Sequence, residues 1–98
     1  GSDVIIFNQD VASQDRYHLL ANRLRGEGIR CDVYLTQKKL PAQFKYADLN
    51  GIPFGIIMSA EDLQAGTCTL RRLATREDIG NLTFESLLSH LKRNKTDC

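Results

Sequence analysis

The chain has 98 residues, of which 42% are hydrophobic and 26% are charged. This length suits one domain whose core needs no disulfide or metal to support it, and these proportions exclude a largely disordered chain. The 13 basic residues nearly balance the 12 acidic ones, and the net charge is +1. A nucleic acid would therefore have to bind through a local basic patch, because the domain as a whole is not a polycation.

The cysteines and the apolar stretches indicate the compartment. Cys31, Cys68 and Cys98 are far apart and form no Cys-x-x-Cys pair, which favours neither a disulfide framework nor a zinc site and is typical of a reducing compartment. The longest apolar stretches, 4–7 and 56–58, are too short to cross a bilayer. We therefore expect a soluble, intracellular protein without membrane contact.

The two ends of the chain suggest the domain boundaries. Residues 1–2, Gly-Ser without an initiator methionine, are typical of the scar of a cleaved expression tag. A single domain is expected over 3–94, and a frayed basic tail over 95–98. The chain is accordingly expected to be one domain of a longer protein.

Apolar runs alternate with helical periodicity in the order typical of an α/β domain. Strands are predicted over 4–7, 29–35, 54–58, 67–73 and 78–82, helices over 13–25, from Pro41 to Asn50 and from Thr83 onwards, and a turn or single helical turn over 59–66. Because a helix joins each of the first three strands to the next, these strands are expected to run parallel, with right-handed crossovers. The predicted fold has three layers: a mixed five-stranded sheet, with three parallel strands plus antiparallel additions, covered by three helices.

The helix that begins near Pro41 is predicted to be amphipathic. Leu40, Phe44 and Ala47 recur at helical spacing and are expected to face the core. The polar residues of this stretch are expected to lie wholly or partly outside: Lys38, Lys39, Gln43 and Lys45.

Patterns for catalysis or cofactor binding are weak. The only G-x-G, residues 26–28, follows a predicted helix and precedes a strand, which is the place of a helix C-cap rather than of a phosphate-binding loop. His18 and His90 are isolated and match no metal-ligand spacing. Cys31 and Cys68 fall in predicted strands, which favours buried, inert thiols. No catalytic residue, metal or cofactor is predicted in the chain, and independent enzyme activity is the weaker hypothesis.

Polar side chains gather just past the ends of two predicted strands and on a third strand. The carboxyl ends of parallel strands form one crevice in open α/β sheets, so the two loops are expected to share one rim, with an arginine of the next strand facing the same region. Lysine and arginine suit phosphates, and glutamine and carboxylates suit base edges, a combination that reads single-stranded RNA loops. The alternative interpretation is a set of solvated surface charges. The predicted RNA-binding residues are Gln37, Lys38, Lys39, Glu61, Asp62 and Arg71.

Two stretches carry a family resemblance: LRGEGIRCDVYL, and then QKKLPAQFKYADLNGIPFGIIMSAEDLQAGTCTLRRL. Together they resemble the carboxy-terminal anticodon-binding domain of class II aminoacyl-tRNA synthetases, and the similarity extends over nearly the whole chain. The stretches QFKYAD and LRRLATRED look most like histidyl-tRNA synthetase, whereas GNLTFESLLSHL equally suits the threonyl branch.

The resemblance implies a domain that grips the anticodon stem-loop of a tRNA. A separate catalytic domain of the parent, a histidine-tRNA ligase by this resemblance, would use ATP and Mg²⁺ to charge the tRNA. The parent is expected to be a homodimer in the cytoplasm or an organelle. Carried onto this sequence, the RNA contacts fall at Gln37, Lys39, Glu61, Asp62 and Arg71. A synthetase-like regulatory or dimerisation domain that does not support aminoacylation is the alternative.

Overall fold

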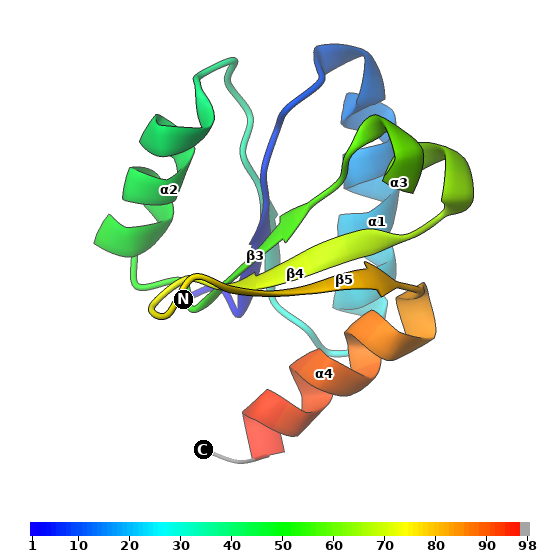
Figure 1. The fold of residues 1–98 in the computed structure, drawn as a ribbon. Coiled ribbons are helices and arrows are strands. Elements are labelled where there is room, and N and C mark those ends of the chain that lie inside the picture. Colours follow the sequence, from blue (N-terminus) through cyan, green and yellow to red (C-terminus); the bar gives the residue numbers. More distant parts are fainter. Residues whose placement is uncertain (97–98) are drawn as a thin grey trace.

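The computed structural model describes residues 1–96, which build a single five-stranded sheet with the strand order β2-β1-β3-β4-β5 (Figure 1). Three strands run parallel, and the last two join antiparallel. The strands are β1 (Val4–Ile6), β2 (Cys31–Val33), β3 (Phe54–Ile57), β4 (Cys68–Arg72) and β5 (Glu77–Leu82). The predicted α/β class and the mixed five-stranded sheet are confirmed.

Helices connect the strands as predicted, with one addition. They are the 3-10 helix η1 (Val11–Ser13) and the α-helices α1 (Gln14–Gly26), α2 (Leu40–Leu49), α3 (Ala60–Ala65) and α4 (Phe84–Thr96). The expected three helices are therefore four α-helices within residues 1–96, because the stretch predicted as a turn or single helical turn forms α3. Within the same residues, every helix is too short or too polar to cross a membrane.

Helix α3 forms because two reciprocal hydrogen bonds cap its first turn. The Ser59 hydroxyl accepts a hydrogen bond from the Asp62 N–H, and the Asp62 carboxylate accepts one from the Ser59 N–H. This capping box satisfies N–H groups that a helix start leaves without partners. Gly66 ends the helix in the left-handed region, with a φ of 73°.

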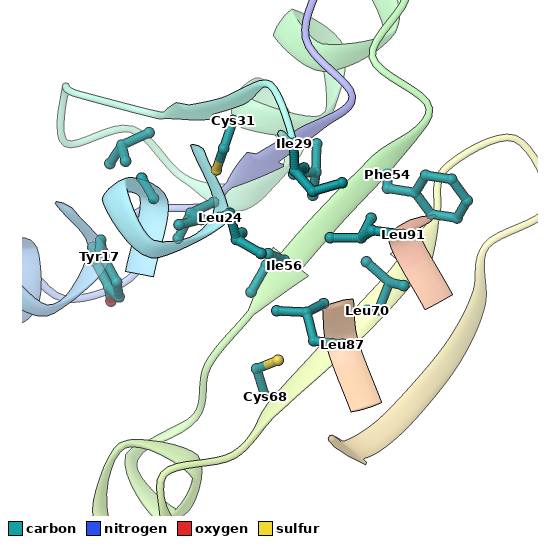
Figure 2. Close-up of a cluster of buried hydrophobic side chains, with 14 of the residues drawn as sticks. Tyr17, Leu24, Ile29, Cys31, Phe54, Ile56, Cys68, Leu70, Leu87 and Leu91 are labelled. Atoms are coloured by element: carbon teal, nitrogen blue, oxygen red, sulfur yellow. The ribbon is translucent and has the colours of Figure 1, made fainter. Parts of the chain in front are cut away.

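Helices α1 and α4 cover one face of the sheet, and α2 covers the other (Figure 1). Figure 2 shows the larger core, in which Leu24 of α1 and Leu87 of α4 pack with Ile56 and Leu70 of the sheet. The smaller core, on the α2 side, contains Ile5, Phe7, Ala47 and Ile52. The central strands are thus buried on both faces, which explains why their sequences are continuously apolar.

The α2 side of the sheet is covered only in part. Leu70 belongs to the core beneath α1 and α4, so its strand neighbours Thr69 and Arg71 project towards the α2 side. There Thr69 and Arg71 are half-buried, and the facing residues of β5 are exposed. Part of a sheet face next to α2 is therefore accessible to a ligand.

Helix α4 extends into the segment that was predicted as a frayed tail. Its start is as predicted, since Ser86 N–H donates to the Thr83 side chain at 3.2 Å. Its end is not, because α4 continues to Thr96. Asp97 and Cys98, the remainder of the predicted tail, lie outside the described residues.

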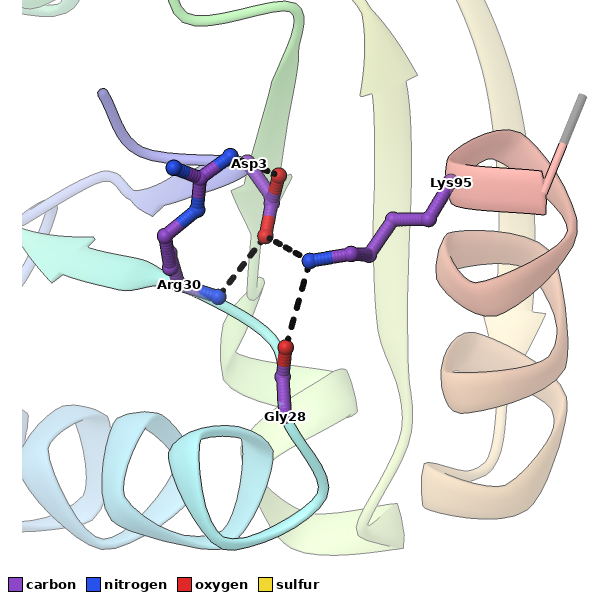
Figure 3. A network of polar contacts seen from close by, with 4 residues as sticks. All are labelled: Asp3, Gly28, Arg30 and Lys95. Carbon is purple, nitrogen blue, oxygen red and sulfur yellow. Dashed lines mark hydrogen bonds and ion pairs between the residues drawn. The ribbon is translucent and has the colours of Figure 1, made fainter. Parts of the chain in front are cut away.

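An ionic network holds the last turn of α4 against the first strand (Figure 3). Lys95 Nζ donates to Asp3 Oδ2 at 3.1 Å and to the Gly28 carbonyl at 3.2 Å. Arg30 N–H donates to Asp3 Oδ2 at 2.8 Å. Burial would raise the pKa of Asp3, but the hydrogen bonds from Arg30 and Lys95 outweigh it, and the pKa lies below its usual value.

We expect Asp3→Asn to lower the free energy of unfolding at pH 7 by about 1–2 kcal/mol, because it removes charge-assisted hydrogen bonds. Since the pKa of Asp3 is lowered by folding, its contribution is complete above the unfolded pKa of about 3.9 and disappears as the pH falls through the folded pKa. Urea unfolding at several pH values from 7 to 2 measures this contribution of Asp3 to the free energy of unfolding. The difference between the variant and the wild type should shrink towards zero at the acidic end; a constant difference would contradict the role given to the carboxylate.

Candidate nucleic-acid interface

The loop that joins β2 to α2 carries the first three predicted residues. Gln37, Lys38 and Lys39 are all exposed. Together with the segment that follows β1, they line an open depression of about 420 Å³. Its lining consists of Asn8, Gln9, Gln37, Lys38, Lys39, Leu40 and Gln43, which include two lysines and no carboxylate. This depression lies at the carboxyl ends of parallel strands, as predicted, and its composition suits a polyanion.

Glu61 and Asp62 lie on α3, just past the carboxyl end of β3. The Asp62 carboxylate already accepts hydrogen bonds from Ser59 N at 3.1 Å and from Thr67 Oγ1 at 2.7 Å. Burial alone would raise its pKa, but these hydrogen bonds bring the pKa of Asp62 below its usual value. Glu61 is exposed. Asp62 therefore shapes α3, whereas Glu61 presents its carboxylate to solvent at this edge.

Arg71 does not share the rim, so this part of the prediction is wrong. It pairs with Gly55, the second residue of β3, whereas the carboxyl-terminal residue of β3, Ile57, pairs with Thr69. Because β4 runs antiparallel, each step along it from Thr69 leads away from the strand ends that carry the two loops. Gln37 to Lys39, Asp62 and Arg71 accordingly line three different depressions.

The Arg71 side chain is held in a fixed position. Its Nε and Nη2 donate to the two carboxylate oxygens of Asp78 on β5, at 2.6 and 2.9 Å, and its guanidinium carbon lies 5.3 Å from the centre of the Phe44 ring. The hydrogen bond from Arg71 lowers the pKa of Asp78, and the same bond raises the pKa of Arg71. Arg71 is therefore a permanently charged group whose orientation is set by its two neighbours.

Arg71 lines a wider depression of about 650 Å³ between α2 and the turn that joins β4 to β5. The full lining is Pro41, Phe44, Lys45, Asp48, Arg71, Leu73, Ala74 and Arg76. Three cations, one carboxylate and one aromatic ring thus line the same depression. Phosphates bind to such cations, and unpaired bases stack on such rings. Lys45 and Arg76 are not among the residues predicted from the sequence, because only the tertiary structure brings the β4–β5 turn beside α2.

Helix α2 lies between the two depressions and borders both. Lys39 and Leu40, at its start, line the smaller one, and Pro41 and Lys45 line the wider one. We call this combined region, from Gln37–Lys39 across the first turns of α2 to Arg71 and Arg76, the α2 surface. It offers five cations on one side of the molecule: Lys38, Lys39, Lys45, Arg71 and Arg76.

Cys31 and Cys68 do not contribute to this surface. Cys31 and Cys68 are buried, as predicted, and burial raises the pKa of each thiol to about 12. Thiols with such a pKa stay protonated near neutrality and are poor nucleophiles. Within residues 1–96, the His, Cys, Asp and Glu side chains form no group of three that could hold a metal ion.

Comparison with known proteins identifies the family of the chain. A family model described as "Anticodon binding domain" matches residues 3–94. A histidine-tRNA ligase of Caulobacter vibrioides is 32% identical over 84 residues, which are 86% of this chain and 16% of the relative. A histidine-tRNA ligase of Rhodopirellula baltica is 41% identical over 68 residues, which are 69% of this chain and 15% of the relative.

Solved structures agree with the sequence relatives. Histidyl-tRNA synthetase from Nostoc sp. PCC 7120 superposes with a TM-score of 0.89 at 25% identity, over 95% of this chain and 22% of that chain. The RNA binding domain of threonyl-tRNA synthetase from Cryptosporidium parvum shares the fold, with a TM-score of 0.85 at 12% identity, over 94% of this chain and 23% of that chain. The chain thus spans about a sixth to a quarter of these relatives. It belongs to the anticodon-binding domain family of class II aminoacyl-tRNA synthetases, and its sequence relatives are histidine-tRNA ligases.

Proposed function

We propose that this domain binds the anticodon stem-loop of a tRNA, as the carboxy-terminal part of a histidine-tRNA ligase. The observation that carries the proposal is the α2 surface, where five cations lie in two adjoining depressions, the wider of which contains the Phe44 ring, in a chain whose net charge is only +1. Such a local concentration of positive charge supplies contacts to the phosphate backbone, which dominate the affinity for nucleic acids.

The side chains have different roles in this proposal. Lys38, Lys39, Lys45 and Arg76 contact phosphates, because they are flexible or exposed cations. Gln37 and Glu61 contact base edges, since both are exposed and supply an acceptor. Arg71, fixed by Asp78, binds a phosphate or a base edge beside the Phe44 ring. Asp62 contributes by keeping α3, and with it Glu61, in place.

The parent protein is part of the same proposal. Its separate catalytic domain would bind ATP and Mg²⁺ and attach histidine to the tRNA, and the parent would act as a homodimer in the cytoplasm. The present domain would supply tRNA affinity and no catalytic group.

The structure of the sheet edge supports RNA binding over the alternative of a dimerisation domain. Strand β5 is one of the two edge strands, the other being β2, and its residues 77–81 are all exposed. The pairing with β4 shifts between Cys68 and Leu70, which leaves Gly80 and Asn81 opposite one residue, and Asn81 has a φ of 54°. A charged edge strand with a bulge is a poor template for pairing with a second sheet.

We expect Lys39→Ala to weaken binding of a histidine anticodon stem-loop about fivefold at 0.1 M salt and to reduce the slope of log K against log salt by about 0.7, because one phosphate contact is lost. Fluorescence anisotropy over a salt series measures both quantities. Lys92→Ala is the matched control, since Lys92 lies on α4 on the other side of the sheet and pairs with Glu27. Equal losses in the two variants, or none in either, would show that the α2 surface does not bind the RNA.

A further inference from the structure

Gln43 is the main exception to the predicted pattern of α2. Helical periodicity places it on the outer side of the helix, yet its side chain is completely buried. Its Oε1 accepts from the Asn8 N–H at 2.8 Å, and its Nε2 donates to the carbonyls of Asn8 at 2.7 Å and of Lys38 at 2.8 Å. Both hydrogens of the amide and one acceptor site of the oxygen are thus used within the protein.

These hydrogen bonds join the two loops that form the smaller depression. Asn8 follows the end of β1, and Lys38 lies in the loop that follows β2. The last backbone bond between the two strands in this region runs from Tyr34 N to Ile6 O. Beyond it the loops diverge, and the Gln43 amide pairs with Asn8 as a neighbouring strand would. Gln43 therefore fixes two segments to α2. One carries Gln9, and the other carries Lys38 and Lys39.

Other hydrogen bonds also hold parts of this region, since the Lys39 carbonyl accepts from the N–H groups of Ala42 and Gln43 at 3.0 and 3.3 Å. Gln14 Nε2 donates to the Leu35 carbonyl at 3.3 Å, in an exposed position, and Lys38 N–H donates to the Thr36 carbonyl at 3.1 Å within the loop itself. Loss of the Gln43 amide would leave the buried backbone groups of Asn8 without partners, and such groups are costly. The loops would then gain conformational freedom. They would have to lose it again when a ligand binds, which lowers the affinity.

We propose that Gln43 is a positioning residue for RNA binding, which acts by holding Lys38, Lys39 and the Asn8–Gln9 segment in the arrangement that receives the RNA. This inference rests on the proposed function. Gln43 itself does not touch the RNA, because its side chain is buried and its amide is engaged with the backbone. It contributes affinity by ordering the two loops before the RNA arrives.

The first test is Gln43→Met, which keeps the length of the side chain and removes the hydrogen bonds. We expect the affinity for the anticodon stem-loop to fall about tenfold through the cost of ordering the loops. The slope of log K against log salt should stay at the wild-type value, since no phosphate contact is removed. Lys39→Ala, measured in parallel, should lower that slope. Far-UV circular dichroism and thermal unfolding confirm that each variant is folded at the temperature of the binding experiment.

The second test is Gln43→Glu, which makes the effect depend on pH. The ionised carboxylate of this variant still accepts from Asn8 N–H but faces the carbonyls of Asn8 and Lys38 with no hydrogen to donate. Protonation returns one donor, and burial raises the pKa of such a carboxyl above its usual value of about 4.3. The RNA affinity of this variant, relative to wild type at each pH, should therefore recover as the pH falls from 8 to 5.

The outcomes separate this inference from the proposed function. If a folded Gln43→Met variant binds as wild type while Lys39→Ala weakens binding, the positioning role is wrong and the proposed function stands. If Gln43→Met does not fold, the pH series of Gln43→Glu decides, and an affinity ratio that does not change with pH overturns the role. If wild type and Lys39→Ala bind the stem-loop equally, the proposed function itself fails.

Discussion

Gly55→Ala is expected to lower the free energy of unfolding by about 3 kcal/mol, in the upper part of the range for overpacked cores. Gly55 lies in β3, between β1 and β4. A Cβ atom at this position would lie 2.8 Å from Phe7 Cζ and still closer to Phe7 Cε2. Phe7 is completely buried and meets the Phe44 ring edge-on, with 4.8 Å between the ring centres, so it has little room to yield.

Urea unfolding followed by circular dichroism measures this loss. Gly26→Ala is the control, because a Cβ at Gly26 has no neighbouring atom within 4 Å and the residue lies at the end of α1 without a positive φ. Alanine favours the helix over glycine, so the control should be unchanged or slightly more stable. A Gly55→Ala variant as stable as Gly26→Ala would contradict the packing of Phe7 across β3.

The second large effect is expected for Arg71→Glu, which should weaken binding of the anticodon stem-loop by about 25-fold at 0.1 M salt. The change removes a cation from the wider depression and places a carboxylate beside Asp78 and Phe44. The local charge becomes more negative by two units where the phosphates are proposed to lie. Each unit is expected to reduce the salt-dependent part of the binding free energy. The fold should survive, because Arg71 and Asp78 are partly exposed and water screens the repulsion between the two carboxylates.

Lys92→Glu changes the net charge by the same amount on α4, on the far side of the sheet. If the total charge of the domain governs binding, the two variants should lose equal affinity. If the α2 surface governs it, Arg71→Glu should lose far more. Anisotropy titrations at two salt concentrations distinguish these results, and equal losses would count against Arg71.

The sequence allows the fold to be predicted because its signals are local. Continuous β-branched and apolar runs mark strands that are covered on both faces, and Gly26 and Pro41 lie at helix ends. Helix α3, predicted only as a turn or single helical turn, also has a local signal, the Ser59-x-x-Asp62 capping box, but six residues between a strand and a glycine are equally typical of a turn.

The site was predicted less well because it depends on distant contacts. Periodicity assigns Gln43 to the helix surface, since a polar residue is buried only where it finds partners, and its partners Asn8 and Lys38 come from two other segments. The position of Arg71 depends on the register of β4 against β3, which alternation alone does not determine. The place of the residues past β2 and β3 was predicted correctly, because parallel strands end at one edge of the sheet.

The central claim is that RNA binds to the α2 surface. Its most direct test is the change in amide NMR shifts when an unlabelled histidine anticodon stem-loop is added to the ¹⁵N-labelled domain. We predict that the largest changes lie at residues 37–39, at Lys45 and over 71–76, while the exposed residues of α1 and α4 stay nearly constant. Changes concentrated on α1 and α4, around Leu19 and Lys92, would contradict the claim.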